Sequence, residues 1–525
     1  MNRLSLVNEI RTGFLVSIIA LPLCLGISMA SGFPAAAGIV TAIIGGIVGG
    51  ALTARMGGAP LTIKGPAAGL IVIVLGGVME LGGGSAAAGY PRLLAAICVA
   101  ALIQVLFGAL RMGRYSSLIP PSVVHGMLAG IGVIIFSKQA HVLLGAAPVA
   151  KTPLDLLKEI PHSIANMNPA VAGVGFLSLA ILIGFNYLPA RISKKIPAQL
   201  VALGIALPAA FFLDFTHAHD LVIAGEHVPV GPQYLVRMPA SIISSLARPE
   251  WSALLDPVTW KYVLLLALIG SVEALLTVQA VDSLDPRRRV SDTNADLVTL
   301  GLANLIAGLC GGLPMISEIV RSRANLDNGA QTSWSNFFHG VFLAAALFLI
   351  PGMLNIIPLA VLASMLLVTA YRLSSPKEFA KVFRIGSDQF AIFVVTMAVT
   401  VGVDLLAGVV AGIVLKMLLH VLRGMRLRDF FSTEVREEMD GNTLTLCVTG
   451  SAVFSNFLAI QKRIDAAPAN VNRVIVDFSA AMFVDHTTLE RLHAIKHSNK
   501  IGTIEVTGLH NLKGVSDHEL ATRRA

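Results

Sequence analysis

Two hydrophobic stretches of this chain contain short interruptions that are rich in glycine, proline and small side chains. The first interruption spans residues 59–69 and the second spans residues 310–318, each in the third hydrophobic segment of its half of the chain. An interrupted membrane helix leaves backbone N–H groups without partners, and the positive end of its dipole can face an anion. Paired interruptions at matching positions therefore indicate the binding site of a secondary transporter.

We expect the backbone N–H groups that follow Gly65–Pro66 and Pro314–Met315 to converge on one site near the middle of the membrane. Small residues let a substrate approach the backbone, and proline in a first helical turn loses no needed N–H group. The alternative is close packing of small residues between helices. The candidate substrate-binding residues are Gly65, Pro66, Ala67, Ala68, Met315, Ile316 and Ser317.

Glu273 places a carboxylate inside an apolar segment. Such a group is costly in a membrane and is a functional hypothesis by default. Thr277 follows four residues later, so both side chains lie on one helix face. Together they could offer oxygen ligands to Na⁺, or Glu273 could carry a proton. The alternative is a carboxylate that pairs with a basic residue or caps a break in the backbone.

Glu318 opens the second half-helix, where the helix dipole favours a negative charge but where that charge would repel a bound anion. The conflict is resolved if Glu318 is protonated, binds a cation or pairs with Lys64, which could also extend towards an interface. Arg321, one turn later, is another candidate partner and attracts anions; a simple Glu318–Arg321 ion pair is the alternative. The candidate Na⁺ ligands are Glu273, Thr277, Ser317 and Glu318.

The composition excludes a soluble globular domain of this length, because 55% of the 525 residues are hydrophobic and only 13% are charged. Apolar runs near 20 residues recur from residue 13 to residue 424, which predicts a polytopic helical membrane protein in contact with lipid. The net charge of +8 reflects basic loop residues that set topology, so we expect no nucleic acid partner. The four cysteines imply neither a disulfide framework nor a zinc site.

We predict fourteen spans, near 13–31, 35–54, 65–82, 91–110, 121–138, 169–189, 197–213, 260–280, 294–311, 314–324, 334–351, 355–371, 388–403 and 405–423. With the N-terminus inside, the basic clusters fall in cytoplasmic loops; they are Arg55, Arg111, Arg114, Arg191, Lys194, Lys195, Arg287–Arg289, Arg372, Lys377, Lys381, Arg384, Arg423, Arg426 and Arg428. Two repeats of seven spans, about 1–213 and 255–424, must have opposite orientations, as in inverted-repeat transporters.

The composition changes after Arg428, where charges become frequent and apolar runs shorten. Strands are predicted at 443–449, 473–478 and 501–507, and helices at 454–466 and 487–497. This alternation indicates a small α/β domain at 429–525, appended on the cytoplasmic side of a transmembrane domain at 1–428.

Taken together, these features resemble the SulP anion transporters, the family of solute carrier 26. The residues that carry the resemblance are Pro22 to Gly32 with Pro34, Gly65 to Leu70, Ser271 to Glu273, Gly311 to Pro314, Asn325 with Gly329, and Ile357 to Ala360. The terminal domain looks like a STAS domain, in which Val484 to Leu489 resemble the loop before a helix.

The resemblance implies core and gate subdomains, a membrane dimer, and an anion site between the third and tenth helices with the first helix alongside. It also places Leu23 at the substrate pocket, where many members carry a polar residue. In bicarbonate transporters of the family, an acidic residue and a threonine on the eighth helix bind Na⁺. Glu273 and Thr277 match that pattern. Glu318 departs from the usual small or hydroxyl residue, which disfavours a divalent anion. Thr487 or Thr488 could be phosphorylated, or could cap the helix.

We therefore predict a secondary transporter of the inner membrane, not an enzyme, because no catalytic triad, metal cluster or phosphate loop is present. Its predicted substrate is a small inorganic oxyanion, bicarbonate first and sulfate second, coupled to Na⁺ or H⁺ by an elevator-type movement. No cofactor is expected beyond Na⁺ as a coupling ion, and the STAS domain could bind a regulatory protein. A different class of hypothesis is an uncoupled anion channel, and a third is a nucleobase permease of the same fold.

Overall fold

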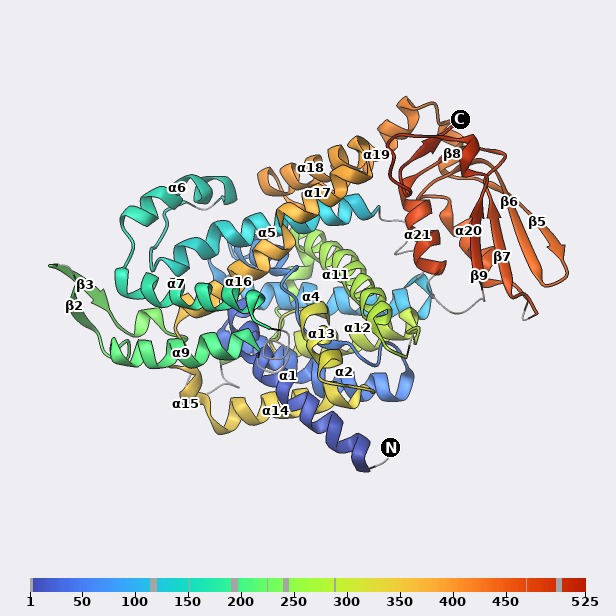
Figure 1. Ribbon diagram of the computed structural model, residues 1–525. Coiled ribbons are helices and arrows are strands. Elements are labelled where there is room, and N and C mark those ends of the chain that lie inside the picture. Colours follow the sequence, from blue (N-terminus) through green and yellow to red (C-terminus); the bar gives the residue numbers. More distant parts are fainter. Residues whose placement is uncertain are drawn as a thin grey trace. The chain divides into compact units, whose positions relative to one another are not determined.

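The computed structural model describes residues 3–113, 120–150, 152–189, 197–223, 225–238, 245–287, 289–468, 470–496 and 503–525. The chain divides into two compact units, one with residues 1–113, 132–285 and 291–372, and one with residues 114–131, 286–290 and 373–525 (Figure 1). Some residues named above lie outside the described residues; they are Arg114, Arg191, Lys194, Lys195 and Arg288, together with residue 497 of the last predicted helix and residues 501–502 of the last predicted strand.

Helices dominate the first unit. In chain order they are α1 (Arg3–Ala30), α2 (Ala35–Met56), α3 (Ile71–Leu81), α4 (Ala86–Ala109), α5 (Pro121–Leu143, which begins in the second unit), α6 (Pro153–Ala165), α7 (Pro169–Gly184), α9 (Ala198–Phe212), α11 (Pro257–Leu284), α12 (Thr293–Leu309), α13 (Ile319–Asp327), α14 (Trp334–Leu349), α15 (Pro351–Leu354) and α16 (Leu359–Leu373). Two short antiparallel pairs join β1 (Ile63–Pro66) to β4 (Met315–Glu318) and β2 (His219–Ile223) to β3 (Glu226–Val230).

One bundle of the first unit consists of α1, α2, α4, α11, α12 and α14, which pack on one another around the β1–β4 pair. Small residues allow these helices to approach closely. At the α2–α14 crossing, a Cβ atom added to Gly46 would lie 2.5 Å from the Cα of Gly340, so the two backbones touch. This bundle holds both interrupted segments.

A second group of helices, α7, α9 and α16, packs through apolar side chains. Its shared cluster includes Val171 and Val174 of α7, Ala202 and Ala206 of α9, and Val361 of α16. Leu23 of α1 belongs to the same cluster, so α1 lies at the boundary between this group and the bundle.

The second unit contains α17 (Pro376–Ile385), α18 (Ser387–Gly402) and α19 (Leu405–Leu422), followed by the α/β domain. That domain has a seven-stranded sheet in the order β10-β11-β8-β6-β7-β9, with β5 paired to β6 (Figure 1). Its elements are β5 (Glu434–Asp440), β6 (Thr443–Ala452), α20 (Phe457–Asp465), β7 (Arg473–Asp477), β8 (Ala481–Val484), α21 (His486–Lys496), β9 (Thr503–Thr507), β10 (Lys513–Gly514) and β11 (Arg523–Arg524). Both α20 and α21 contribute to one apolar core with the sheet.

Each of the fourteen predicted spans coincides with a helix, although the number of membrane crossings remains a prediction. Among the described residues, seven helices are long and apolar enough to cross a membrane, and five shorter apolar helices accompany them. The predicted loop at 139–168 contains α6, and the predicted loop at 214–259 contains the β2–β3 hairpin. Neither was predicted, because α6 is amphipathic and both elements are short.

Candidate functional site

The two interrupted segments lie side by side as an antiparallel strand pair. Ile63 is opposite Glu318, Lys64 is opposite Ser317, Gly65 is opposite Ile316, and Pro66 is opposite Met315. Since α3 begins five residues after β1 and α13 begins directly after β4, the pairing brings the beginnings of both half-helices together. Free N–H groups and positive dipole ends at helix starts favour anions.

Lys64 does not pair with Glu318, which was one of the partners that the sequence suggested. Its ammonium lies 2.8 Å from a carboxylate oxygen of Asp296 in α12, and both side chains are buried. The same oxygen accepts from the backbone N–H of Ala59 at 3.1 Å, and the other oxygen accepts from Ser317 at 3.5 Å. Lys64 and Ser317 are opposite each other in the strand pair, so both side chains face α12.

Side chains of α13, the helix that follows β4, form hydrogen bonds with the backbone at the start of β1 and just before it. The hydroxyl of Ser322 accepts from the backbone N–H of Ile63 at 2.9 Å and donates to the carbonyl of Glu318 at 2.6 Å. The amide of Asn325 donates to the carbonyl of Leu61 at 2.9 Å. Buried backbone groups left open by the broken helices are thus satisfied by side chains.

Arg321 is fully buried beside the strand pair. Its Nη2 donates to the carbonyl of Pro66 at 3.3 Å, and a Cβ atom added to Gly65 would overlap its Nη1. Among the described residues, Nε and Nη1 have no hydrogen-bond partner. In the described part of the chain, Arg321 and Glu318 form no ion pair. The Glu318–Arg321 pair that the sequence offered as an alternative therefore does not describe this site. A buried guanidinium with open donors can bind an oxyanion.

Two carboxylates lie close to the interrupted segments. Glu318 caps α13, because its side chain accepts from the N–H of Val320 at 3.2 Å. Glu273 of α11 lies against the turn after β1, where a Cβ atom added to Gly69 would overlap its carboxylate. Its Oε2 is buried and has no hydrogen-bond partner among the described residues. Glu318 is close enough to Glu273 for the two negative charges to repel each other. Thr277 lies one helical turn after Glu273 on α11.

A cavity opens beside Arg321 and Glu318. The residues that line it are Leu23, Ile27, Ala68, Leu182, Ala198, Gln199, Glu318, Val320, Arg321, Met365, Leu366, Val368, Thr369 and Arg372. One wall therefore comes from the interrupted segments and α1, and the other comes from α7, α9 and α16. Gln199 and Thr369 were not singled out from the sequence, and Arg372 was predicted only as a basic residue of a cytoplasmic loop, because a polar residue near a helix end has many possible roles.

Of the predicted substrate residues, Leu23 and Ala68 line this cavity. Met315, Ile316 and Ser317 are buried in the strand pair, and Gly65 and Pro66 lie opposite them. The predicted Na⁺ set of Glu273, Thr277, Ser317 and Glu318 is not assembled as a whole, since Ser317 is turned towards Asp296. Sequence reasoning missed Asp296 and Ser322, and it named Asn325 only as part of the family resemblance, because the roles of all three depend on partners far away in the chain.

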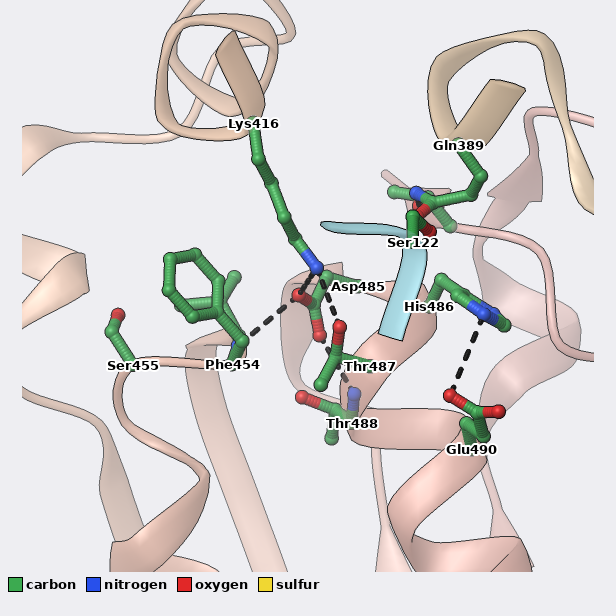
Figure 2. A network of polar contacts seen from close by, with 12 residues as sticks. Ser122, Gln389, Lys416, Phe454, Ser455, Asp485, His486, Thr487, Thr488 and Glu490 are labelled. Carbon is green, nitrogen blue, oxygen red and sulfur yellow. Dashed lines mark hydrogen bonds and ion pairs between the residues drawn. The ribbon is translucent and has the colours of Figure 1, made fainter. Parts of the chain in front are cut away.

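The loop before α21 forms a separate polar network in the second unit (Figure 2). Lys416 of α19 lies 2.9 Å from Asp485 and donates to the hydroxyl of Thr487 at 2.5 Å. The N–H of Thr488 donates to Asp485 at 2.8 Å, as expected for a helix cap. Burial would raise the pKa of the Asp485 carboxyl, but the Lys416 ammonium and these hydrogen bonds outweigh it and lower that pKa. Thr487 and Thr488 are fully buried. The capping side chain is that of Asp485, so neither threonine hydroxyl supplies the helix cap that the sequence suggested, and the hydroxyl of Thr487 accepts from Lys416 instead.

A family profile and individual relatives both match this chain over most of its length. The profile of the sulfate permease family matches residues 6–396. The putative sulfate transporter YvdB of Bacillus subtilis is 29% identical over 420 residues, which cover 79% of this chain and 74% of that protein. The bicarbonate transporter BicA of Picosynechococcus sp. is 26% identical over 408 residues, which cover 77% and 68%.

Solved structures with the same fold include the transmembrane domain of a cyanobacterial bicarbonate transporter BicA. It has a TM-score of 0.62 and 25% identity, covering 79% of this chain and 98% of that one. The murine Solute Carrier 26 family member A9 anion transporter in the inward-facing state has a TM-score of 0.66 and 15% identity, covering 96% and 86%. The second of these shows the fold alone.

Proposed function

The chain belongs to the sulfate permease family of multi-pass membrane anion transporters, and we propose that it carries bicarbonate, coupled to Na⁺ or H⁺ through Glu273. The observation that carries this proposal is the pairing of β1 with β4 beside Arg321, Glu318 and Glu273. The anion would bind at the cavity wall formed by the starts of α3 and α13, with Arg321 as the main source of positive charge.

The charges around this wall favour a monovalent substrate. Arg321 contributes one positive charge, whereas Glu318 and Glu273 each contribute one negative charge when ionised. Two carboxylates that share a region oppose each other's ionisation, so a proton or Na⁺ at Glu273 removes the repulsion. The charges of Arg321 and Glu318 then balance before the anion enters, and Arg372 on the opposite wall adds one further positive charge. One excess positive charge matches a monovalent anion better than a divalent one. Coupling follows because the anion site improves when the cation site is filled.

The movement that we propose is of the elevator type. Polar contacts join the interrupted segments to α12, through Asp296, and to each other, through Ser322 and Asn325. The opposite wall of the cavity, from α7, α9 and α16, packs through apolar side chains instead. A segment fixed by buried polar bonds moves with its bundle, whereas an apolar boundary can slide.

Sulfate is the second candidate, because the similar protein YvdB is a putative sulfate transporter. An uncoupled anion conductance is the third, and Glu273 is the residue that argues against it. Purified protein in proteoliposomes, offered labelled bicarbonate, sulfate, chloride and fumarate under imposed Na⁺ and H⁺ gradients, distinguishes the three. Gradient-driven bicarbonate accumulation supports the proposal. Sulfate accumulation without bicarbonate uptake overturns the substrate, and currents that ignore both cation gradients overturn the coupling.

We also propose an inner-membrane dimer with the N-terminus and the C-terminal domain in the cytoplasm, where that domain would bind a regulatory protein. Two natural cysteines test the orientation, since Cys310 ends α12 and is exposed while Cys447 lies in β6. A membrane-impermeant thiol reagent should label Cys310 in intact cells and reach Cys447 only after lysis. Labelling of Cys447 in intact cells would reverse the proposed orientation. Crosslinking of the purified protein tests the dimer.

A further inference from the structure

Asn304 lies in the middle of α12 with its side chain buried. Its Oδ1 accepts from the backbone N–H of Met315 at 2.7 Å, and its Nδ2 donates to the carbonyl of Met315 at 3.0 Å. The same Nδ2 donates to Oε1 of Gln104, in α4, at 2.9 Å. One amide thus satisfies both backbone groups of a single residue and is itself held by a second amide.

The residue so held is the first of β4. Its partner in register is Pro66, which has no N–H and cannot donate a hydrogen bond across the strand pair. A buried carbonyl or N–H without a partner is costly. Asn304 supplies to the Met315 carbonyl the donor that the proline cannot supply, and its own oxygen accepts from the Met315 N–H.

Gln104 connects this contact to a third helix. A Cβ atom added to Gly270 would lie 3.3 Å from Nε2 of Gln104, so α11 passes close to the amide. Gly270 precedes Glu273 by three residues, which is about one helical turn. The two amides therefore lie between the helix that carries Glu273 and the strand that leads to Arg321.

We propose that Asn304 and Gln104 are positioning residues for anion transport, and that they set the backbone of Met315 and through it the start of α13. This inference rests on the proposed function, in which the anion binds beside that helix start. Neither amide lines the cavity, so neither touches the anion. Their removal displaces the binding groups without removing any of them.

The test compares variants of the full-length protein in proteoliposomes, with KM and maximal rate measured for labelled bicarbonate and sulfate. Asn304→Ala, which removes both hydrogen bonds to Met315, should raise KM for the transported anion about tenfold, while the maximal rate stays within about twofold. Gln104→Met, which keeps length but loses the acceptor, should raise KM about threefold. Gln104→Glu, whose carboxyl oxygen can still accept from Asn304, should keep KM at the parent's value.

Asn168→Ala is the matched control. Asn168 is also a buried amide that holds a distant backbone, since it accepts from the N–H groups of Ala170 and Val171 and donates to the carbonyl of Pro229 at 2.7 Å. Its loss should lower the melting temperature as Asn304→Ala does, yet leave KM unchanged. Equal KM shifts in both variants would mean that Asn304 only stabilises the fold.

Arg321→Gln separates this inference from the proposed function. If Arg321→Gln raises KM but Asn304→Ala and Gln104→Met do not, the positioning role is wrong and the anion site stands. If Arg321→Gln leaves KM unchanged, the anion site itself is wrong. If Asn304→Ala fails to fold, the two Gln104 variants decide. A higher KM in Gln104→Met with the parent's KM in Gln104→Glu supports the positioning role, and a KM raised equally in both variants contradicts it.

Discussion

The ammonium of Lys64 lies 2.8 Å from the carboxylate of Asp296, and neither side chain reaches solvent. This pair joins β1 to α12, and it neutralises the lysine that stands inside the interrupted segment. A buried ion pair is expensive to desolvate, but removing one partner leaves an uncompensated charge, which is more expensive still.

Lys64→Met should therefore lower the free energy of unfolding by about 3–5 kcal/mol. The double variant Lys64→Met/Asp296→Leu should recover part of that loss, because no lone carboxylate remains. Thermal unfolding of the purified protein measures both. Arg323→Gln, which removes the exposed Arg323–Asp327 pair, should cost about 1 kcal/mol at most. A Lys64→Met protein as stable as the parent would show that the pair contributes nothing.

Glu273→Gln should abolish uptake driven by a cation gradient, because an amide can neither release a proton nor compensate a bound Na⁺. The protein should remain folded and should still bind the anion. Uptake into proteoliposomes under imposed gradients is the measurement. Glu80→Gln is the control, since Glu80 is an exposed carboxylate that pairs with Lys261 at 3.1 Å. Concentrative uptake by Glu273→Gln at the parent level would refute the coupling role.

Glu318→Ala should remove cation dependence and improve the tolerance of divalent anions, because a negative charge leaves the cavity wall beside Arg321. It also removes the cap on Val320, so Glu318→Gln is needed as a second variant that keeps an acceptor but no charge. Both variants should shift the ratio of sulfate to bicarbonate uptake in the same direction. If Glu318→Gln keeps the parent's ion dependence and selectivity, Glu318 is only a helix cap, and the preference for bicarbonate loses its basis.

The C-terminal domain should lose stability as the pH falls below about 6.5. Burial lowers the pKa of His486 below that ordinary value, with Glu490 acting in the opposite direction. The unfolded chain then takes up a proton that the folded domain does not, so stability is present above about pH 6.5 and decreases below it.

Thermal unfolding of the full-length protein between about pH 7.5 and about pH 5.5 measures this effect. His486→Gln should show a smaller decrease in melting temperature than the parent over that range. His217→Gln, which changes a histidine exposed in a loop, should follow the parent. An identical pH dependence in the parent and in His486→Gln would exclude His486 as the source.

Much of the architecture follows from local sequence patterns. The strands and helices predicted at 443–449, 454–466 and 473–478 occur as β6, α20 and β7, with ends shifted by a few residues. The two interrupted segments occur as short strands followed by short helices. Hydrophobic runs, glycine and proline determine such features, because the cost of an unsatisfied backbone group or of an exposed apolar face is local.

The partners of the polar residues could not be predicted in this way. Lys64 and Asp296 are 232 residues apart in the sequence. Asn304 reaches the backbone of Met315 only because α12 packs against β4. Successive residues of β4 point to opposite faces of the strand. Ser317 contacts Asp296 because its face meets α12, and Glu318, on the opposite face, lines the cavity.

By itself, the sequence determined that the chain is a polytopic helical protein with two broken segments, a carboxylate inside a span and an α/β domain at its C-terminal end. Only the tertiary structure decided that Lys64 pairs with Asp296 and not with Glu318, and which helices form the far wall of the cavity. The physical reason is that periodicity and turn residues act over a few positions, whereas pairing between buried charges depends on how whole helices pack.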